Sequence, residues 1–346
     1  SYRRAFTLLE ASLAAAPADA AAQRDMIMTC GKLSDLLWSQ NDAAGALLYS
    51  RQTVARSARL AARAPADRRA RYFVAASLLD HGYKLFMIRG DTVAALRAMR
   101  RSVAVLESLH AAAPADPLPA RTLALGYGRM AEALESRDDY TAALSTYRKG
   151  LRLLQTLLGA APRNTDLRHL LAFAQLNIAE VLTELGRLDE AAQSAQTALA
   201  SFESLTASDP KIAEYRHDIG RALASLARIA GLRGQPERSI ALLQQALAQM
   251  DAAARGSARD SNFEIGRARM ELLAGDEYAA LAADTRRSES RRSQDWRKSC
   301  REYESALTRY RRLSGAWAAA VPRAAEAQKK IRGCDAALAA IPHGLD

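Results

Sequence analysis

The most restrictive feature of this sequence is a repeat with a period of 48 residues. Five prolines, each closing an alanine-rich or similar short segment, are separated by 48, 49, 48 and 48 residues: Pro17, Pro65, Pro114, Pro162 and Pro210. A second series lies midway between them, spaced by 49, 48, 48 and 48 residues: Asn41, Gly90, Asp138, Gly186 and Gly234. Two series with one period predict a structural unit that is repeated along the chain.

Each period predicts a pair of helices, because proline and the midway residues mark turns at both ends of each segment. Aromatic residues make up only 6% of the chain, which argues against a β-rich fold. We expect first helices at 21–39, 67–88, 117–136, 165–185 and 212–232. We expect second helices at 41–62, 91–112, 139–160, 188–207 and 236–254. Neither helix can bury its apolar stripe alone, so the hairpins must stack on one another.

Small residues recur at fixed distances from the midway series, where two helices have to approach closely. Seven positions before it stand Ser34, Tyr83, Ala131, Ala179 and Ala227, with the tyrosine as the one large residue. Five positions after it stand Ala46, Ala95, Ala143, Ala191 and Ser239. This pattern resembles the tetratricopeptide repeat, here lengthened to 48 residues. The resemblance implies an all-α fold, a right-handed α-solenoid of helical hairpins.

The predicted domain organisation has three parts. Residues 1–254 form the array, with a half repeat at 1–17 followed by about five units. Residues 255–294 form an irregular last unit with a basic linker, and 295–341 form an atypical C-terminal capping hairpin. Because 1–17 aligns only with the end of a second helix, we expect the chain to be a fragment of a longer protein.

The capping hairpin makes a prediction about two cysteines. In an antiparallel hairpin, the numbers of two residues that face each other always add to the same sum. The apolar positions of this segment can be paired in that way, from Trp296 with Leu338 to Leu313 with Val321. This register places Cys300 opposite Cys334, so a disulfide is geometrically feasible and would indicate an oxidising compartment. The alternative is a pair of buried thiols. Cys30 has no evident partner and is expected in the core.

The formal net charge of +11 is concentrated at the C-terminal end. Between Arg255 and Arg332 we count 18 basic and 11 acidic residues, a difference of +7. The basic run Arg286–Gln294 could contact nucleic acid. However, Trp296 fits the apolar stripe, and the run is interpreted as a solvated loop. No segment is long and apolar enough to span a membrane, and no signal peptide opens the chain.

Motifs for catalysis, cofactors and metals are missing from the sequence. There is no H-E-x-x-H or C-x-x-C motif, no phosphate-binding glycine loop and no kinase signature. His169 and His217 lie one repeat apart, which favours a structural role. We therefore expect a chain that is not an enzyme and needs no cofactor.

The remaining candidate is the concave face that tetratricopeptide-like arrays form from their first helices. The repeat geometry directs these charged residues inward: Asp35, Asp80, Lys84, Glu132, Glu135, Glu180, Glu184 and Arg228. The middle of this face is acidic and its ends are mixed, which predicts a protein or peptide partner of basic or mixed charge. The alternative is that these residues are merely solvated.

Several segments resemble the repeat arrays found C-terminal to many bacterial serine/threonine protein kinases. They are SYRRAFTLLEASLAAAPAD, SDLLWSQNDAAGALLYSRQTV, AEALESRDDYTAALSTYRKGL and the ending DWRKSCREYESALTRYRRL…KKIRGCDAALA. This resemblance implies a sensory or partner-binding region outside the cytoplasm, with the kinase domain elsewhere. Two alternatives remain open: a cytoplasmic scaffold or transcription-regulator sensor domain, and a nucleic-acid-binding helical array.

Overall fold

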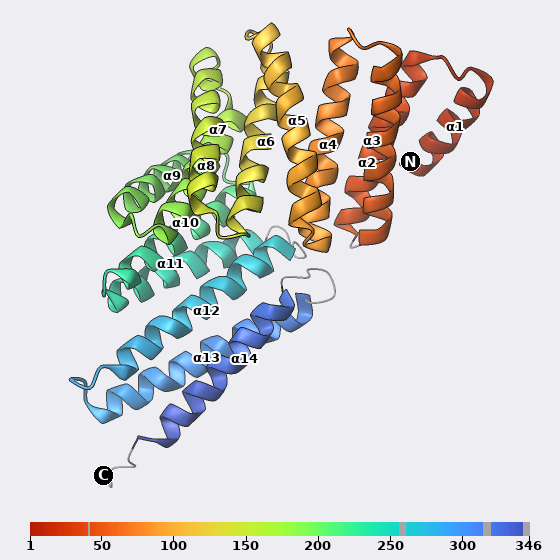
Figure 1. Ribbon diagram of the computed structural model, residues 1–346. Coiled ribbons are helices and arrows are strands. Elements are labelled where there is room, and N and C mark those ends of the chain that lie inside the picture. The colour runs from red at the N-terminus through yellow and green to blue at the C-terminus, as the bar shows by residue number, and fades with distance from the viewer. Residues whose placement is uncertain (41, 256–260, 314–319, 342–346) are drawn as a thin grey trace. The chain divides into compact units, whose positions relative to one another are not determined.

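The computed structural model describes residues 1–40, 42–255, 261–313 and 320–341, which form helices and no strand (Figure 1). The first seven helices are α1 (Tyr2–Ala15), α2 (Ala20–Ser39), α3 (Ala43–Arg63), α4 (Arg68–Arg89), α5 (Thr92–Ala112), α6 (Pro117–Glu135) and α7 (Tyr140–Ala160). They are followed by α8 (Thr165–Glu184), α9 (Leu188–Ser208), α10 (Ala213–Leu232), α11 (Pro236–Ala254), α12 (Ser261–Ala283), α13 (Glu289–Leu313) and α14 (Ala320–Ala339). The predicted all-α array is confirmed, and α2 to α11 begin and end within two residues of the predicted positions.

The first helices begin where the prolines predicted, and in α2, α4 and α6 an aspartate two residues after the proline caps the helix. Asp19 accepts hydrogen bonds from the backbone N–H groups of Ala21 and Ala22, at 2.8 and 3.1 Å. Asp67 caps α4 and Asp116 caps α6 in the same way. Such caps satisfy N–H groups that have no partner inside the helix.

The midway series marks the C-terminal ends of first helices. Gly90, Asp138, Gly186 and Gly234 have φ angles of 67°, 58°, 70° and 71°. This left-handed conformation closes a helix, and glycine adopts it without a steric penalty. The remaining member of the series, Asn41, lies outside the described residues.

The small-residue positions allow close contact between the two helices of a hairpin. Ala46, Ala95, Ala143, Ala191 and Ser239 are completely buried. In α2, the Ser34 hydroxyl donates a hydrogen bond of 2.7 Å to the backbone carbonyl of Ala46. In α4 the residue closest to the backbone of α5 is Gly82, one position before Tyr83. A Cβ atom placed on Gly82 would lie 3.1 Å from the Ala95 carbonyl oxygen. Tyr83, the exception in its column, is therefore free to turn away from α5.

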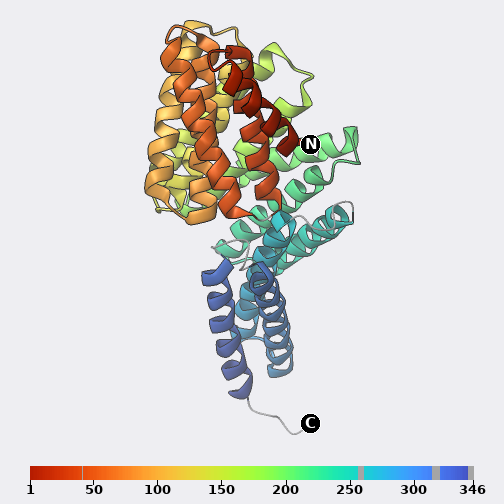
Figure 2. The same ribbon diagram turned by 90° about the vertical axis from the view of Figure 1, so that its right-hand side faces the viewer.

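The helices divide into two compact units, residues 1–162 and 163–346, which are described separately. In unit 1, α2 to α7 stand side by side and each packs on the next (Figures 1 and 2). In unit 2, each helix from α8 to α14 also packs on its successor. Each unit has its own buried clusters, one including Leu106 and Tyr127 and another including Phe202 and Met250.

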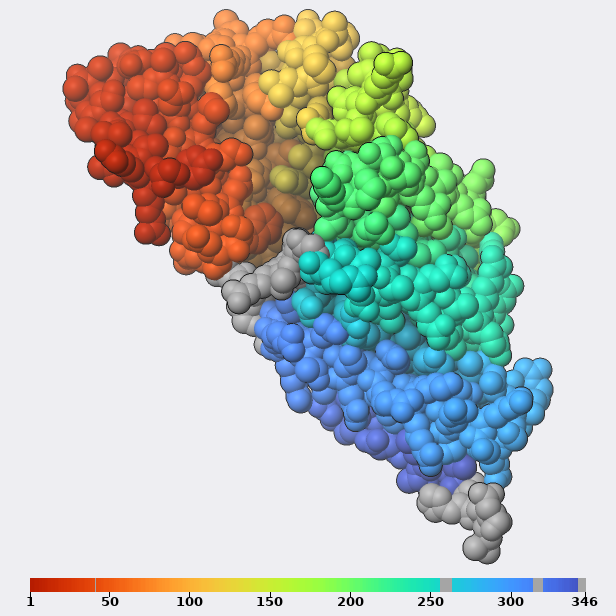
Figure 3. All heavy atoms as spheres, turned by 180° about the vertical axis from the view of Figure 1, so that it is seen from behind, coloured from red at the N-terminus to blue at the C-terminus, as the bar shows by residue number. Residues whose placement is uncertain are grey.

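The C-terminal hairpin is formed by α13 and α14, and it packs on α12 through α13. On the face drawn in Figure 3, these helices present a continuous surface (blue). Trp296, Tyr303, Leu307, Ala327 and Ile331 share one apolar cluster, as the predicted stripe requires. The pair of Leu313 with Val321 was predicted wrongly, because Val321 is 57% exposed and Ala320 is buried instead.

The basic run before Trp296 was also misassigned, because much of it is helical. The helix α13 begins at Glu289, so Arg291 and Arg292 belong to its first turn. The Ser288 hydroxyl accepts a hydrogen bond from the Arg291 backbone N–H, at 3.4 Å. The guanidinium of Arg292 donates to the carbonyl of Ala282 at the end of α12, at 2.9 Å. These polar contacts compensate for the lack of apolar residues, which is why the hydrophobic pattern missed this turn.

Candidate binding surface

The predicted binding residues all lie on first helices. We refer to the exposed side of α2, α4 and α6 as the first-helix face of unit 1, and to that of α8 and α10 as the first-helix face of unit 2. Within unit 1, the structure brings Asp35, Asp80 and Lys84 together. Within unit 2, it brings Glu184 and Arg228 together, with an Arg228 Nη1 to Glu184 Oε1 distance of 2.7 Å. Glu132 lies half-buried on α6.

Lys84 connects α4 to α2, and its side chain points toward neighbouring carboxylates of the protein and not toward solvent. Its Nζ atom donates to both carboxylate oxygens of Asp80 at 2.6 Å and to Asp35 Oδ1 at 2.9 Å. The ammonium also lies 5.4 Å from the ring centroid of Trp38. The Lys84 side chain is completely buried, while Asp35 is 56% exposed. The lysine therefore offsets one of the two negative charges that were predicted to attract a basic ligand.

Glu135 is directed toward its own second helix. Its carboxylate accepts a hydrogen bond of 2.6 Å from the hydroxyl of Tyr147, a side chain buried on α7. A buried tyrosine hydroxyl needs such a partner, because leaving it unpaired is costly. Glu135 thus has a structural contact that the repeat geometry alone did not reveal.

The charged residues of unit 2 pair across neighbouring first helices. Arg221 on α10 contacts Glu180 on α8 at 3.2 Å, and its guanidinium lies 4.8 Å from the ring centroid of Phe173. The Arg228–Glu184 pair forms a second link between the same two helices, about two turns further along α10. The first-helix face of unit 2 is consequently mixed in charge and is not dominated by its carboxylates.

The sequence prediction missed an aromatic and cationic group on the first-helix face of unit 1. Trp38 and Tyr83 have ring centroids 5.9 Å apart. The guanidinium of Arg129 on α6 lies 4.4 Å from the centroid of Tyr83, a cation–π geometry. We name Trp38, Tyr83 and Arg129 the aromatic ledge. The signal for it was Tyr83, the one large residue in a column of small ones.

Four large apolar side chains are exposed on α2 and α6, two of the helices that form the ledge: Met28, Leu36, Leu118 and Leu125. Met28 on α2 is 52% exposed and Leu125 on α6 is 40% exposed. Leu125 precedes Arg129 by four residues, which places both on one side of α6. Exposed apolar groups beside tyrosine, tryptophan and arginine are the typical composition of a protein-binding surface.

A buried charged cluster links α8 to α10 in unit 2. His169 Nε2 lies 2.7 Å from Asp218 Oδ2, and His217 Nδ1 lies 3.4 Å from Asp218 Oδ1. Burial opposes ionisation of Asp218, but the hydrogen bonds from His169 and His217 and the charge of Arg221 lower its pKa to about 2. Burial likewise opposes ionisation of His169, but Asp218 raises the His169 pKa. The predicted structural role for these histidines agrees with this geometry.

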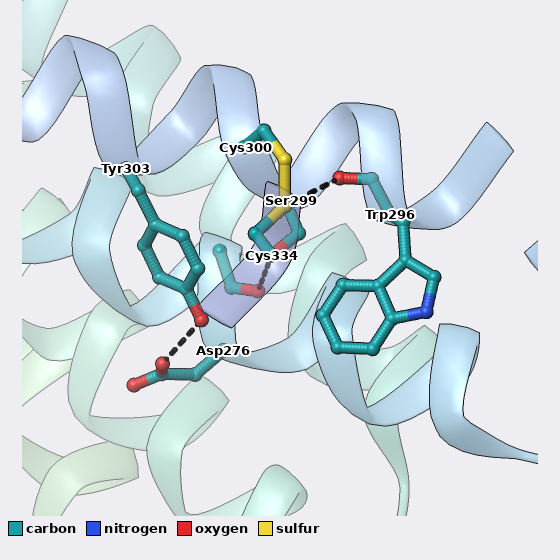
Figure 4. The surroundings of a disulfide bond; sticks show 7 residues. Asp276, Trp296, Ser299, Cys300, Tyr303 and Cys334 are labelled. Carbon is teal, nitrogen blue, oxygen red and sulfur yellow. Dashed lines mark hydrogen bonds between the residues drawn. A yellow bond between two sulfur atoms is a disulfide. The ribbon is translucent and has the colours of Figure 1, made fainter. Parts of the chain in front are cut away.

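A disulfide joins Cys300 on α13 to Cys334 on α14, with a Cα–Cα distance of 5.8 Å (Figure 4). The Sγ atom of Cys334 lies 3.1 Å from the backbone carbonyl oxygen of Trp296. Beside the disulfide, Tyr303 donates a hydrogen bond of 2.7 Å to Asp276 on α12, as Figure 4 shows. Cys30, which was expected in the core, is a buried free thiol.

The described residues contain neither a cluster suited to a metal ion nor a helix suited to span a membrane. Across the ranges given above, no group of three or more histidine, cysteine, aspartate or glutamate side chains could hold a metal ion. None of the helices described is both long enough and apolar enough to cross a bilayer.

Comparisons with solved structures relate the chain to known helical-repeat folds. A signal-transduction ATPase with a tetratricopeptide repeat sensor, from Pyrococcus horikoshii, matches with a TM-score of 0.52 and 15% identity, over 85% of this chain and 38% of that chain. A Rap protein complexed with competence and sporulation factor matches with a TM-score of 0.51 and 15% identity, over 90% of this chain and 77% of that one. Aspartyl phosphate phosphatase F from Bacillus subtilis matches with a TM-score of 0.52 and 11% identity, over 94% and 73%.

These likenesses concern the fold, an array of tetratricopeptide-like helical hairpins. The chain spans well under half the length of the first structure, the signal-transduction ATPase. No protein-family model matches the sequence, and a search of curated proteins also found no match.

Proposed function

We propose that this chain is a non-catalytic module that binds a peptide or protein segment on the first-helix face of unit 1. The observation that carries this proposal is the aromatic ledge with exposed Leu125 one helical turn from Arg129. The Rap protein of similar fold was solved with competence and sporulation factor, and the ATPase is described as having a repeat sensor. Both descriptions are compatible with ligand binding by such an array.

We expect a partner of mixed charge with an apolar anchor. A strongly basic partner fits less well, because Lys84 already offsets one of the two negative charges of Asp35 and Asp80. Arg129 has no ion-pair partner among the described residues, so its guanidinium can donate hydrogen bonds to a carboxylate while it remains over the Tyr83 ring. An apolar side chain next to that carboxylate would lie against Leu125.

The proposal is tested by selecting peptides from a random display library on the immobilised chain. The enriched peptide is then synthesised, and its affinity is measured by fluorescence anisotropy. We expect Arg129→Gln to weaken binding about tenfold, the effect of one charge-assisted hydrogen bond. Arg100→Gln, on an exposed position of α5, is the matched control and should bind normally. Failure to enrich any peptide, or equal affinities of the two variants, would contradict the proposal.

We also infer that the chain is the partner-binding region of a bacterial serine/threonine protein kinase, located outside the cytoplasm. The support is the resemblance of its segments to such arrays, together with the disulfide, which is typical of oxidising compartments. Sequencing the complete reading frame tests this inference. A kinase catalytic domain followed by a membrane-spanning segment is expected upstream, and a reading frame without a kinase domain would refute it.

A further inference from the structure

A pocket of about 350 Å³ opens in unit 1 on the side of the second helices. Glu107 and His110 of α5 line one wall, and Lys149 and Arg152 of α7 line the other. Leu123 and Tyr127 of the intervening helix α6 also line it. These helix surfaces are distinct from the first-helix face, so the pocket is independent of the proposed peptide site.

The pocket combines an apolar base with a charged edge. Leu123 and Tyr127 are 3% and 7% exposed, and the Tyr127 hydroxyl donates a hydrogen bond of 2.6 Å to Glu107 Oε1. The ammonium of Lys149 lies 5.9 Å from the centroid of the Tyr127 ring. The aromatic ring is therefore held in place by a carboxylate on one side and a cation on the other.

The positive charge of the pocket is not fully neutralised by the protein. Among the residues that the structure describes, neither Lys149 nor Arg152 has an ion-pair partner, and both side chains are exposed. Glu107 supplies one negative charge against these two cations. In addition, His110 has a buried Nδ1 atom without a hydrogen-bond partner in the described part of the chain. An anionic ligand would correct this imbalance.

The repeat itself indicates that these side chains are not needed for packing. One groove earlier, between α3 and α5, the positions of His110, Lys149 and Arg152 hold Ala61, Arg101 and Ala104. The corresponding positions of the groove between α9 and α11 hold Thr206, Gln245 and Ala248. In a repeat protein, residues required by the fold recur, so a combination that occurs in one groove alone points to a local function.

We propose that this pocket binds a small organic anion, a carboxylate joined to an apolar body. The carboxylate would contact Arg152 and Lys149, and the apolar body would lie on Leu123 and the ring of Tyr127. Arginine binds carboxylates through two parallel hydrogen bonds, and a pocket of this size accommodates a body as large as a phenyl group.

The ligand class is tested by isothermal titration calorimetry on the full chain with 3-phenylpropionate as the probe. Acetate supplies the charge without the apolar body, and 3-phenylpropanol supplies the body without the charge. We expect saturable binding of 3-phenylpropionate and binding at least about tenfold weaker for each comparator. No saturable binding of 3-phenylpropionate, or binding as strong for either comparator, overturns the proposal.

The location is tested with two substitutions of matched chemistry. Arg152→Gln should weaken 3-phenylpropionate binding about tenfold, the effect of losing one charge-assisted contact. Arg101→Gln changes an exposed arginine at the equivalent of Lys149 in the preceding groove and should leave binding unchanged. Circular dichroism verifies that both variants are folded. Equal losses in both variants, or no loss in Arg152→Gln, would show that the probe binds elsewhere.

Discussion

At the scale of single residues, the pair of His169 and Asp218 gives the chain a defined pH dependence. The raised pKa of His169 means that its stabilising charge is fully present below its ordinary pKa of about 6.5. This contribution is lost as the pH rises through the higher pKa of the folded state. The contribution of Asp218 is lost in the opposite direction, as the pH falls from about 4 toward its folded pKa of about 2.

We therefore predict that His169→Gln destabilises unit 2 most between about pH 4.5 and 6.5, by about 2 kcal/mol, the usual value for a hydrogen bond to a charged group. The difference from the parent protein should shrink as the pH is raised to 8.5. Thermal unfolding of both proteins across this range measures it. A difference that grows with pH would contradict the proposed ionisation.

Residue-scale features were the hardest to predict from the sequence. The repeat identified which side chains lie on first helices, but it did not reveal their partners on neighbouring helices. Lys84 was expected to face a ligand and is instead buried between Asp35 and Asp80. Glu135 was expected to face inward and binds Tyr147. Such contacts depend on side-chain directions across 12 to 49 residues of sequence, which periodicity does not encode.

At the scale of helices, the packing of α4 on α5 depends on the missing side chain at Gly82. An added Cβ atom would lie 3.1 Å from both the Ala95 carbonyl oxygen and Met99 Cγ. We predict that Gly82→Ala destabilises unit 1 by about 1–2 kcal/mol through overpacking, although alanine is the better helix former. Gly128→Ala on α6 is the matched control, because no atom lies within 4 Å of its added Cβ. It should stabilise by about 0.5–1 kcal/mol. Urea unfolding measures the change in unfolding free energy for both variants. If both variants were stabilised, or both destabilised, this explanation would be wrong.

The hairpin of α13 and α14 depends on its disulfide. The bridge closes a loop across a sequence separation of 34, and the loop-entropy relation gives a stabilisation of about 3–4 kcal/mol as an upper value. We predict that denatured, unreduced protein contains one free thiol, Cys30, and that Cys300→Ser/Cys334→Ser lowers the melting temperature. Thiol titration with peptide mapping tests the pairing. In Cys30→Ser, the mapped bridge should persist and no thiol should titrate. Three thiols in oxidised material would refute the pairing.

Helix boundaries were predicted well because turn chemistry is local. An aspartate two residues after the proline caps α2, α4 and α6, and a left-handed residue follows the ends of α4 and α6. These signals need no knowledge of the tertiary structure. The start of α13 was missed for the opposite reason. Its first turn is held by Arg292 and by the pair of Arg287 with buried Asp295, contacts that involve a neighbouring segment.

At the scale of the whole molecule, the regular spacing predicted one continuous array over 1–254, whereas the described contacts group the helices into units 1–162 and 163–346. The spacing of prolines does not change at residue 162, so the sequence gives no sign of this grouping. Each unit buries its own clusters. Leu176, Phe202, Leu205, Leu243 and Met250 come together from α8, α9 and α11 within unit 2 alone.

We predict that the oxidised fragment 163–346 folds without residues 1–162, because its core clusters are formed by its own helices. Far-UV circular dichroism should show a helical fragment with a cooperative thermal transition. The fragment 213–346 is the matched control. It lacks α8 and α9, which contribute Leu176, Phe202 and Leu205 to the cluster that α10 and α11 complete. Removing these side chains leaves cavities that cost several kcal/mol, so this shorter fragment should melt at a markedly lower temperature or without cooperativity. If 163–346 itself unfolds non-cooperatively, its core is not sufficient and the two units are one folding domain.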